Sequence, residues 1–210
     1  MEPSQRKERE KQIRRLHILE AAKEVFNAKG FNGATMEEIA EKAGYSPAAL
    51  YLYFKNKYEL YISLNINTLD HMVELFENLT AHPDLGSLEK LRRIADVFYE
   101  IYEFNPLSVG NLFRLQGTQG LDEMSPDILE KLNEQTTRAI RLVAQIFETG
   151  IREGIFLDYH PMALADSVWA QFTGLVIWEE GKRSLDPSKQ FLKPTMDMAL
   201  EILIRGITRN

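Results

Sequence analysis

Apolar residues recur at intervals of three and four along almost the whole chain, which is the spacing of one face of an α-helix. Residues 10–29 show the pattern clearly, with apolar positions at Leu16, Leu19, Ala22, Val25 and Phe26. Residues 126–153 repeat it, and no stretch alternates apolar and polar residues as a half-buried strand does. The pattern therefore predicts an all-α protein.

Local signals mark the ends of these helices. Thr35 is followed three residues later by Glu38, which is the capping-box arrangement, and Ser46 precedes Pro47 as an N-cap residue before a helix-starting proline. A further segment is expected to end near residues 117–120, and Ser87 is expected to cap the helix that it opens. The predicted helices cover approximately residues 10–29, 36–43, 47–54, 56–79, 87–104, 126–153, 161–181 and 188–208.

The two short helices near residues 36–54 have the spacing of a helix-turn-helix. Their inner faces are predicted to be apolar, and the second helix turns small residues and tyrosines outward. Small outer residues let a helix enter a DNA major groove, and tyrosine hydroxyls at its rim can bind phosphates. A helical hairpin whose aromatic residues only pack explains the periodicity equally well. The outward residues are Pro47, Ala48, Ala49, Tyr51 and Tyr53.

Charge is distributed unevenly along the chain. The 210 residues carry a formal net charge of -6. Residues 1–60 hold 11 Lys and Arg against 9 Asp and Glu, and the remainder is strongly acidic. An acidic surface repels nucleic acid, so any DNA contact is expected from the N-terminal third. There the candidates for extra phosphate contacts, each equally well explained as part of a solvated face, are Arg6, Lys7, Arg9, Lys11, Arg14 and Arg15.

The chain contains no cysteine, which excludes disulfides and thiolate metal sites and fits a reducing compartment. No apolar run approaches the roughly 20 residues of a membrane span, and the charged N-terminus lacks the apolar core of a secretory signal. We therefore expect a soluble, cytoplasmic protein with no membrane partner.

Residues 18–60, ILEAAKEVFNAKGFNGATMEEIAEKAGYSPAALYLYFKNKYEL, resemble the DNA-binding domain of TetR-family transcriptional regulators. The remaining residues resemble the family more loosely, in their helical pattern and in the stretch GIREGIF that precedes a proline-started helix containing tryptophan. The resemblance implies a three-helix helix-turn-helix domain, residues 1–55, followed by a larger helical-bundle domain for ligand binding and dimerisation, residues 56–210. The matching positions are Ile18, Leu19, Ala21, Ala22, Phe26, Gly30, Phe31, Thr35, Ile39, Ala40, Ala43, Gly44, Ser46, Leu50, Tyr51, Phe54, Lys57 and Leu60.

The resemblance also implies roles for individual residues. Thr35, Tyr51 and Lys57 are expected to contact phosphates, while the outward residues of the short helix face bases or the groove edge. Two positions depart from the family pattern: Ala48 stands where glycine is frequent, and Tyr45 stands where valine is frequent. The predicted DNA-binding residues are Thr35, Tyr45, Ser46, Pro47, Ala48, Ala49, Tyr51, Tyr53 and Lys57.

One stripe of the helix predicted at residues 161–181 is lined with small residues that allow a second helix to approach closely. Because one helix-turn-helix covers one half-site, a two-fold dimer is expected, and the final helix has apolar residues on more than one face for such a contact. Tight packing within one chain is the alternative. The predicted interface residues are Ala163, Ser167, Ala170, Gly174 and Ile177.

The regulatory region contains more large apolar side chains than helix stripes require, including Tyr99, Phe104 and Trp178. Together they allow an apolar cavity with a few polar tips, which is the usual form of a small-molecule site. The absence of a basic cluster favours a neutral, cationic or weakly acidic hydrophobic effector. The predicted ligand-binding residues are Phe98, Tyr102, Phe113, Gln116, Trp169, Phe172 and Thr173.

The resemblance to the TetR family implies a DNA-binding transcriptional regulator, by default a repressor released from a palindromic operator by a small hydrophobic ligand. No cofactor or metal site is predicted, and the chain is expected not to be an enzyme, because its four histidines lie far apart in sequence and no phosphate-binding loop is present. The alternatives are a helical metal-binding protein or enzyme, and a sequence-nonspecific DNA-binding protein.

Overall fold

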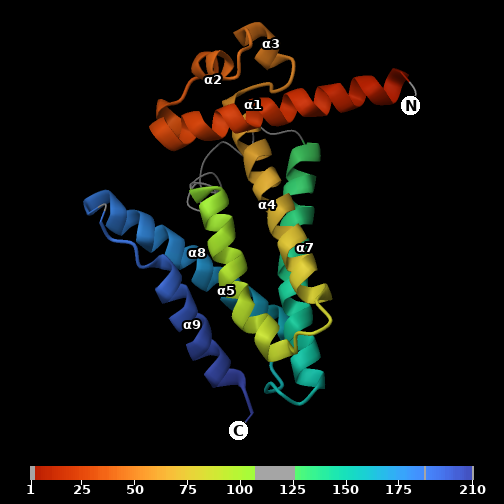
Figure 1. Cartoon of the computed structure of the whole chain (residues 1–210), viewed down its shortest axis with the longest axis vertical. Helices are drawn as coiled ribbons and strands as arrows, with labels where there is room; N and C mark the ends of the chain where they lie inside the picture. The colour runs from red at the N-terminus through yellow and green to blue at the C-terminus, as the bar shows by residue number, and fades with distance from the viewer. Residues whose placement is uncertain (1–2, 107–125, 187, 210) are drawn as a thin grey trace. The chain divides into compact units, whose positions relative to one another are not determined.

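The computed structural model describes residues 3–106, 126–186 and 188–209 (Figure 1). The described residues are helical apart from turns and one isolated β-bridge, between Phe156 and Thr208, so the all-α prediction is confirmed. No helix in these ranges is long and apolar enough to cross a membrane. The helices are α1 (Pro3–Gly33), α2 (Met36–Lys42), α3 (Pro47–Tyr51), α4 (Lys57–Ala81), α5 (Ser87–Phe104), α7 (Pro126–Arg152), α8 (Pro161–Leu185) and α9 (Leu192–Ile207).

Several helix ends differ from the prediction. α1 begins at Pro3 rather than near residue 10, and α9 begins at Leu192 rather than near residue 188. The prediction that Ser87 caps α5 is wrong: Gly86 is the N-cap, and the Ser87 hydroxyl donates instead to Glu153 Oε2 at 2.7 Å. The segment predicted to end near residues 117–120 lies outside the described residues.

The described residues divide into two compact units within α4, one ending at Asn67 and the other beginning at Thr68. The domain boundary predicted between residues 55 and 56 directly precedes α4, earlier in the chain than this division. Residues 126–129 belong with the first unit, and the rest of α7 belongs with the second. α4 is therefore a single helix that contributes to both units.

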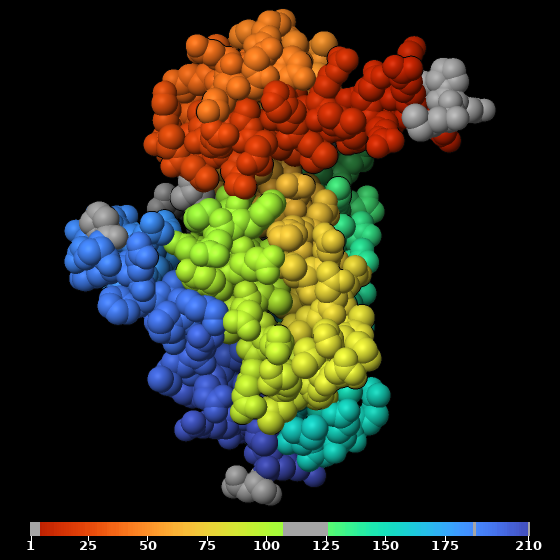
Figure 2. Space-filling model, in the orientation of Figure 1, coloured from red at the N-terminus to blue at the C-terminus, as the bar shows by residue number. Residues whose placement is uncertain are grey.

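The first unit packs α1, α2, α3 and the start of α4 around a small aromatic and aliphatic core. Gly30 interrupts α1 with a φ of 68°, a left-handed conformation that glycine adopts without strain. The first turns of α1 extend beyond the surface that α2 and α3 form (Figure 2). The core is made of buried residues that include Ile18, Ala22, Phe26, Ile39, Leu50, Phe54, Leu60 and Tyr61.

The second unit contains the rest of α4 with α5, α8, α9 and most of α7. One continuous apolar core joins these helices and includes Phe76, Phe98 and Phe147. The chain after α9 is tied back to the connection between α7 and α8: Leu157 N donates to Ile207 O at 2.7 Å, and Arg209 N donates to Ile155 O at 2.9 Å. These bonds flank the Phe156–Thr208 bridge and hold the last turn of α9 in place.

Among the glycines that the structure describes, Gly150 in α7 is the most tightly constrained by its neighbours. A Cβ at this position would lie 2.2 Å from two ring carbons of Phe156, which is fully buried. We expect Gly150→Ala to destabilise the protein by about 2 kcal/mol, because overpacking outweighs the helix propensity that alanine adds. Thermal unfolding followed by circular dichroism measures this loss. Phe156→Leu introduced together with Gly150→Ala should cost less than the two single changes added together, and simple additivity would contradict the clash.

Candidate nucleic-acid interface and ligand sites

The predicted capping box of α2 is present. Thr35 Oγ1 accepts from Glu38 N at 3.2 Å, and Glu38 Oε2 accepts from Thr35 N at 3.2 Å. Lys29 Nζ lies 2.6 Å from Glu38 Oε1. The hydrogen bond from Lys29 is the main reason that the pKa of Glu38 lies below its ordinary value. The exposed Thr35 hydroxyl thus already serves the fold, and it still has a proton to donate to a phosphate.

The start of α3 follows the prediction as well. Ser46 Oγ accepts from Ala49 N at 3.2 Å, and Pro47 occupies the first helical position. Ser46, Pro47 and Ala48 form the start of this helix, and Ala48 is exposed. Tyr51 is 49% exposed, whereas Tyr53 is half-buried. Of the predicted DNA-binding residues in α3, Pro47, Ala48 and Tyr51 are therefore exposed, and Ala49 is half-buried.

Leu52 directly follows α3 and is 82% exposed, although it was not among the predicted site residues. A leucine within an apolar repeat is normally assigned to the core. Helical spacing, however, places Leu52 about 200° around the helix axis from both Leu50 and Phe54, away from the inner face that these two residues form. The helical period was therefore the sequence signal that could have identified Leu52 as an outward residue.

Tyr45 lies in the turn between α2 and α3. Its ring meets the ring of His17 from α1 edge to face, with centroids 6.0 Å apart. This contact fixes the aromatic side chain that stands where valine is frequent. Its predicted contact with DNA remains a prediction.

Lys57 is held by the fold at the first turn of α4. Its ammonium donates to Ala34 O at 2.8 Å and lies 4.7 Å from the centroid of the Phe31 ring. An ammonium has three donors, so two remain for a phosphate. Asn56 Oδ1 accepts from Glu59 N at 2.8 Å, which confirms the predicted start of α4.

The basic residues predicted for extra phosphate contacts differ in their surroundings: Arg6 pairs with Glu10 at 3.1 Å on the surface, and Arg9 is exposed. Arg15 Nη2 donates to Ser63 Oγ at 2.7 Å, and its guanidinium lies 4.6 Å from the centroid of the Phe54 ring, so this residue serves the first unit itself. Lys7, Lys11 and Arg14 are exposed and have no hydrogen-bond or ion-pair partner within the described residues. Their spacing of four and three places them on one face of the helix.

The apolar ligand residues that the structure describes are packed closely. Phe98 and Phe172 stack with centroids 4.1 Å apart, and Trp169 meets Phe98 edge to face at 6.1 Å. Beside them, between α5, α8 and α9, lies a cavity of about 20 Å³, room for about one water. Thr173 is buried, and its hydroxyl has no hydrogen-bond partner among the described residues. Phe113 and Gln116 lie outside the described residues.

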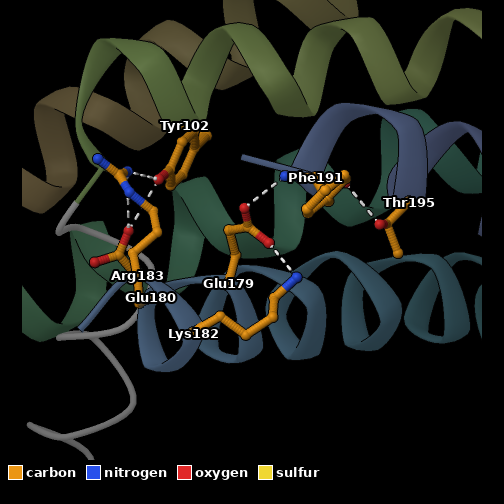
Figure 3. A network of polar contacts seen from close by, with 7 residues as sticks. All are labelled: Tyr102, Glu179, Glu180, Lys182, Arg183, Phe191 and Thr195. Carbon is orange, nitrogen blue, oxygen red and sulfur yellow. Dashed lines mark hydrogen bonds and ion pairs between the residues drawn. The ribbon is translucent and has the colours of Figure 1, made fainter. Parts of the chain in front are cut away.

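A larger cleft of about 450 Å³ lies at the ends of α5 and α8 and the start of α9. Arg183 Nη1 donates to Tyr102 Oη at 2.6 Å, and Tyr102 donates to Glu180 Oε1 at 2.9 Å (Figure 3). Burial, the hydrogen bond to Glu180 and its charge raise the pKa of Tyr102 to about 12, so its hydroxyl stays protonated. Of the predicted ligand residues that the structure describes, Tyr102 alone lines this cleft.

Beside this network, Glu179 is buried by the loop that precedes α9. Its carboxylate accepts from Phe191 N at 2.8 Å and lies 2.5 Å from Lys182 Nζ (Figure 3). Burial alone would raise the pKa of Glu179, but these two donors hold it below its ordinary value. Sequence reasoning missed this cluster. Its only sequence signal is the pairing of opposite charges three residues apart, which usually marks a solvated helix face.

The small-residue stripe of α8 lies on the surface of the chain. Ala170, Gly174 and Ile177 are exposed along it, and Ser167 is half-buried. Ala163 begins the same stripe in the first turn of α8. Met198 and Ile202 of α9 are 62% and 64% exposed. Trp178 is 66% exposed, so its inclusion among the cavity-forming side chains is wrong: it continues this surface rather than the core.

Comparison with known proteins agrees with this arrangement. Residues 18–64 match the family described as bacterial regulatory proteins, tetR family. The transcriptional regulator SrpR of Pseudomonas putida is 30% identical over 184 residues, which are 85% of this chain and 80% of SrpR. The chain belongs to the TetR family. The repressor NicS of Pseudomonas putida is 31% identical to this TetR-family chain over 145 residues, 68% of the chain and 65% of NicS.

The crystal structure of the TetR-family regulator PfmR from Thermus thermophilus has the same fold. It superposes with a TM-score of 0.72 at 22% identity, covering 91% of this chain and 99% of PfmR. The family assignment resolves the ambiguity left by periodicity: the helix-turn-helix belongs to a DNA-binding transcriptional regulator, and its relatives are regulators rather than enzymes.

Proposed function

We propose that this TetR-family regulator is a repressor that binds a palindromic operator as a homodimer and leaves it when a small hydrophobic ligand binds. The observation that carries the proposal is the exposed surface of α3, where Pro47 and Ala48 leave room for a base pair edge and Tyr51 stands beside them. The repressor NicS supports the sign of regulation. A regulator of this kind acts where the chromosome lies, so the proposal includes a cytoplasmic location.

Readout by α3 is apolar and shape-based. None of its residues is an Arg, Asn or Gln, the side chains that form bidentate bonds with purines in the major groove. Ala48 and the exposed Leu52 can contact thymine methyl groups. Remaining specificity comes from the sequence-dependent shape of the duplex.

Phosphate contacts are assigned to groups around this surface. Thr35 and Tyr51 are exposed and carry hydroxyls, and Lys57 retains free donors at the first turn of α4, where helix N–H groups also attract anions. The unpartnered stripe of Lys7, Lys11 and Arg14 adds cations on one face of α1. Arg15 is excluded from this set because its guanidinium is used inside the unit.

Dimerisation is assigned to the exposed faces of α8 and α9. No atom from outside its own stretch of helix lies within 4 Å of the position that a Cβ at Gly174 would occupy, so no other described element covers it. A helix of a second copy can approach closely along a surface lined by glycine and alanine. The apolar Ile177, Met198 and Ile202 would be removed from water by the same contact.

Ligand release is assigned to the second unit. The hydroxyl of Thr173, near Trp169 and Phe172 in α8, has no partner among the described residues and is a polar group that a ligand can satisfy if the packed aromatic residues open. α4 belongs to both units, so a change in the second unit that moves α4 also moves Lys57. A ligand shifts operator binding only by the difference between its affinities for the conformation that binds the operator and for the conformation that does not.

Selection of bound duplexes from a random DNA pool tests this function. The expected result is an inverted repeat whose half-sites are contacted by two copies of the protein. Recovery of unrelated sequences with equal affinity would instead identify a nonspecific DNA-binding protein. Repeating the selection against a library of hydrophobic compounds then identifies those that release the operator.

Tyr51→Phe and Lys57→Ala test the phosphate contacts on the selected operator. Tyr51→Phe is expected to weaken binding by about 1 kcal/mol through the loss of one hydrogen bond. Lys57→Ala should weaken binding to every sequence and reduce the slope of log affinity against log salt by about 0.9. Fluorescence-anisotropy titrations at several salt concentrations measure both effects. Lys189→Ala, which removes an exposed lysine of the second unit, is the control that should leave the slope unchanged.

A further inference from the structure

We propose that the cleft at the ends of α5 and α8 binds an organic cation with bulky apolar or aromatic groups, with Glu103 as its counter-ion. The cleft has a volume of about 450 Å³, roughly three times that of a cavity that holds benzene. Its lining includes side chains from α5 and α8 and from the start of α9 with the loop before it. A regulatory role for this cleft rests on the proposed ligand-responsive function, whereas binding of the cation to the cleft does not require DNA.

The apolar part of the cleft suits a bulky, partly aromatic guest. Tyr99 and Tyr102 lie three residues apart in α5, with ring centroids 6.3 Å apart. Pro106, Leu192 and Pro194 supply further apolar surface. The faces of tyrosine rings attract cations as well as apolar groups.

The charges around the cleft favour a cation over an anion. Glu179 is balanced by Lys182, and Arg183 lies 3.8 Å from Glu180. The Arg183 guanidinium is also tied to the Tyr102 hydroxyl. These pairs leave no net positive charge for an incoming anion.

The two remaining charged residues of the lining are Lys193 and Glu103, and carboxylates outside the lining offset the charge of Lys193. Lys193 Nζ lies 2.5 Å from Asp197 Oδ1 and 2.9 Å from Asp96 Oδ1, so one lysine faces two carboxylates. Glu103 is exposed and forms no ion pair with any cation that the structure describes. Burial and the neighbouring Glu103 charge raise the pKa of Tyr99, which keeps that hydroxyl neutral. Glu103, which interacts with the Tyr99 hydroxyl but has no cationic partner among the described residues, is therefore the carboxylate that would pair with a bound cation.

The cleft and the small apolar cavity are lined by neighbouring stretches of the same three helices. The small apolar cavity is lined by residues 94–98 of α5, 168–175 of α8 and 196–200 of α9. The cleft is lined by residues 99–106, 179–183 and 190–194. On each helix the residues that line the cleft are close in sequence to those that line the cavity. An apolar substituent of the cation can therefore point toward Leu192 and the Phe98–Phe172 stack.

Tetraphenylphosphonium and tetraphenylborate test this proposal, because the two ions have nearly the same shape and opposite charge. Isothermal titration of the full chain without DNA should show the phosphonium binding at least about tenfold more tightly than the borate, and Glu103→Gln should reduce phosphonium affinity by about tenfold, the order expected for one partly solvated charge pair. The same substitution should not weaken borate binding.

Glu100→Gln is the matched control. It removes the same charge from α5, but Glu100 is exposed outside the cleft lining, so phosphonium affinity should be unchanged. Circular dichroism checks that both variants keep their helices. Equal binding of the two ions, tighter binding of the borate, no binding of either ion, or equal effects of the two variants would each overturn the cation site. None of those outcomes bears on whether the protein binds an operator, which the DNA selection measures separately.

Discussion

Ala48→Glu is expected to abolish operator binding while leaving the fold intact. Ala48 is exposed in the second position of α3, so glutamate at this site would face the DNA and add a negative charge beside phosphates. Like charges brought together across an interface cost several kcal/mol, so the loss should be on the order of 100-fold or more. Anisotropy titrations with the selected operator measure it.

The same substitution should slightly favour α3 itself, because an acidic side chain in the first turn interacts well with the helix dipole. Thermal unfolding is therefore expected to be unchanged or slightly later. Ala48→Gln separates size from charge: it should bind more tightly than Ala48→Glu. If Ala48→Glu bound the operator normally, the exposed side of α3 would not be the reading surface.

Gly174→Arg is expected to produce a folded monomer that no longer holds the operator. The position is open among the described residues of the single chain, and arginine favours a helix over glycine by roughly 1 kcal/mol, so the monomer should not be destabilised. A long charged side chain would keep a second α8 from approaching. Losing the second half-site contact should reduce operator affinity by about 100-fold or more.

Sedimentation velocity measures the oligomeric state of this variant, and circular dichroism measures its helix content. Asn133→Arg is the matched control, since it adds the same charge at an exposed position of α7. The control should remain a dimer. A dimer that persists in Gly174→Arg would place the interface on another surface.

The elements predicted best from sequence are those fixed by local interactions. The capping box at Thr35 and the Ser46-Pro47 start depend on residues within one turn, and both are present. The exposed stripe of α8 also follows from helical periodicity alone, because the opposite face carries Val168 and Phe172. Interactions within one helical turn and the helical spacing of apolar residues were therefore sufficient to predict the fold class and the exposed surface of α3.

The features that sequence did not predict depend on long-range contacts. Arg15 reads as one more basic residue of α1, yet Ser63 and Phe54, far along the chain, hold it inside the first unit. Glu179 reads as a surface residue, yet the loop before α9 buries it. In each case the partner comes from a different element, and helical spacing carries no information about which elements meet.

The short bridge beyond α9 has a consequence for how fast two copies combine. Leu157 N and Arg209 N fasten the chain at both sides of Thr208, so the last turn of α9 is ordered before any partner arrives. A surface that is already ordered gives up little conformational entropy on association. Monomers should therefore meet at a rate limited by diffusion and mutual orientation, without a slow folding step, and differences in dimer affinity among variants should appear mainly as differences in dimer lifetime.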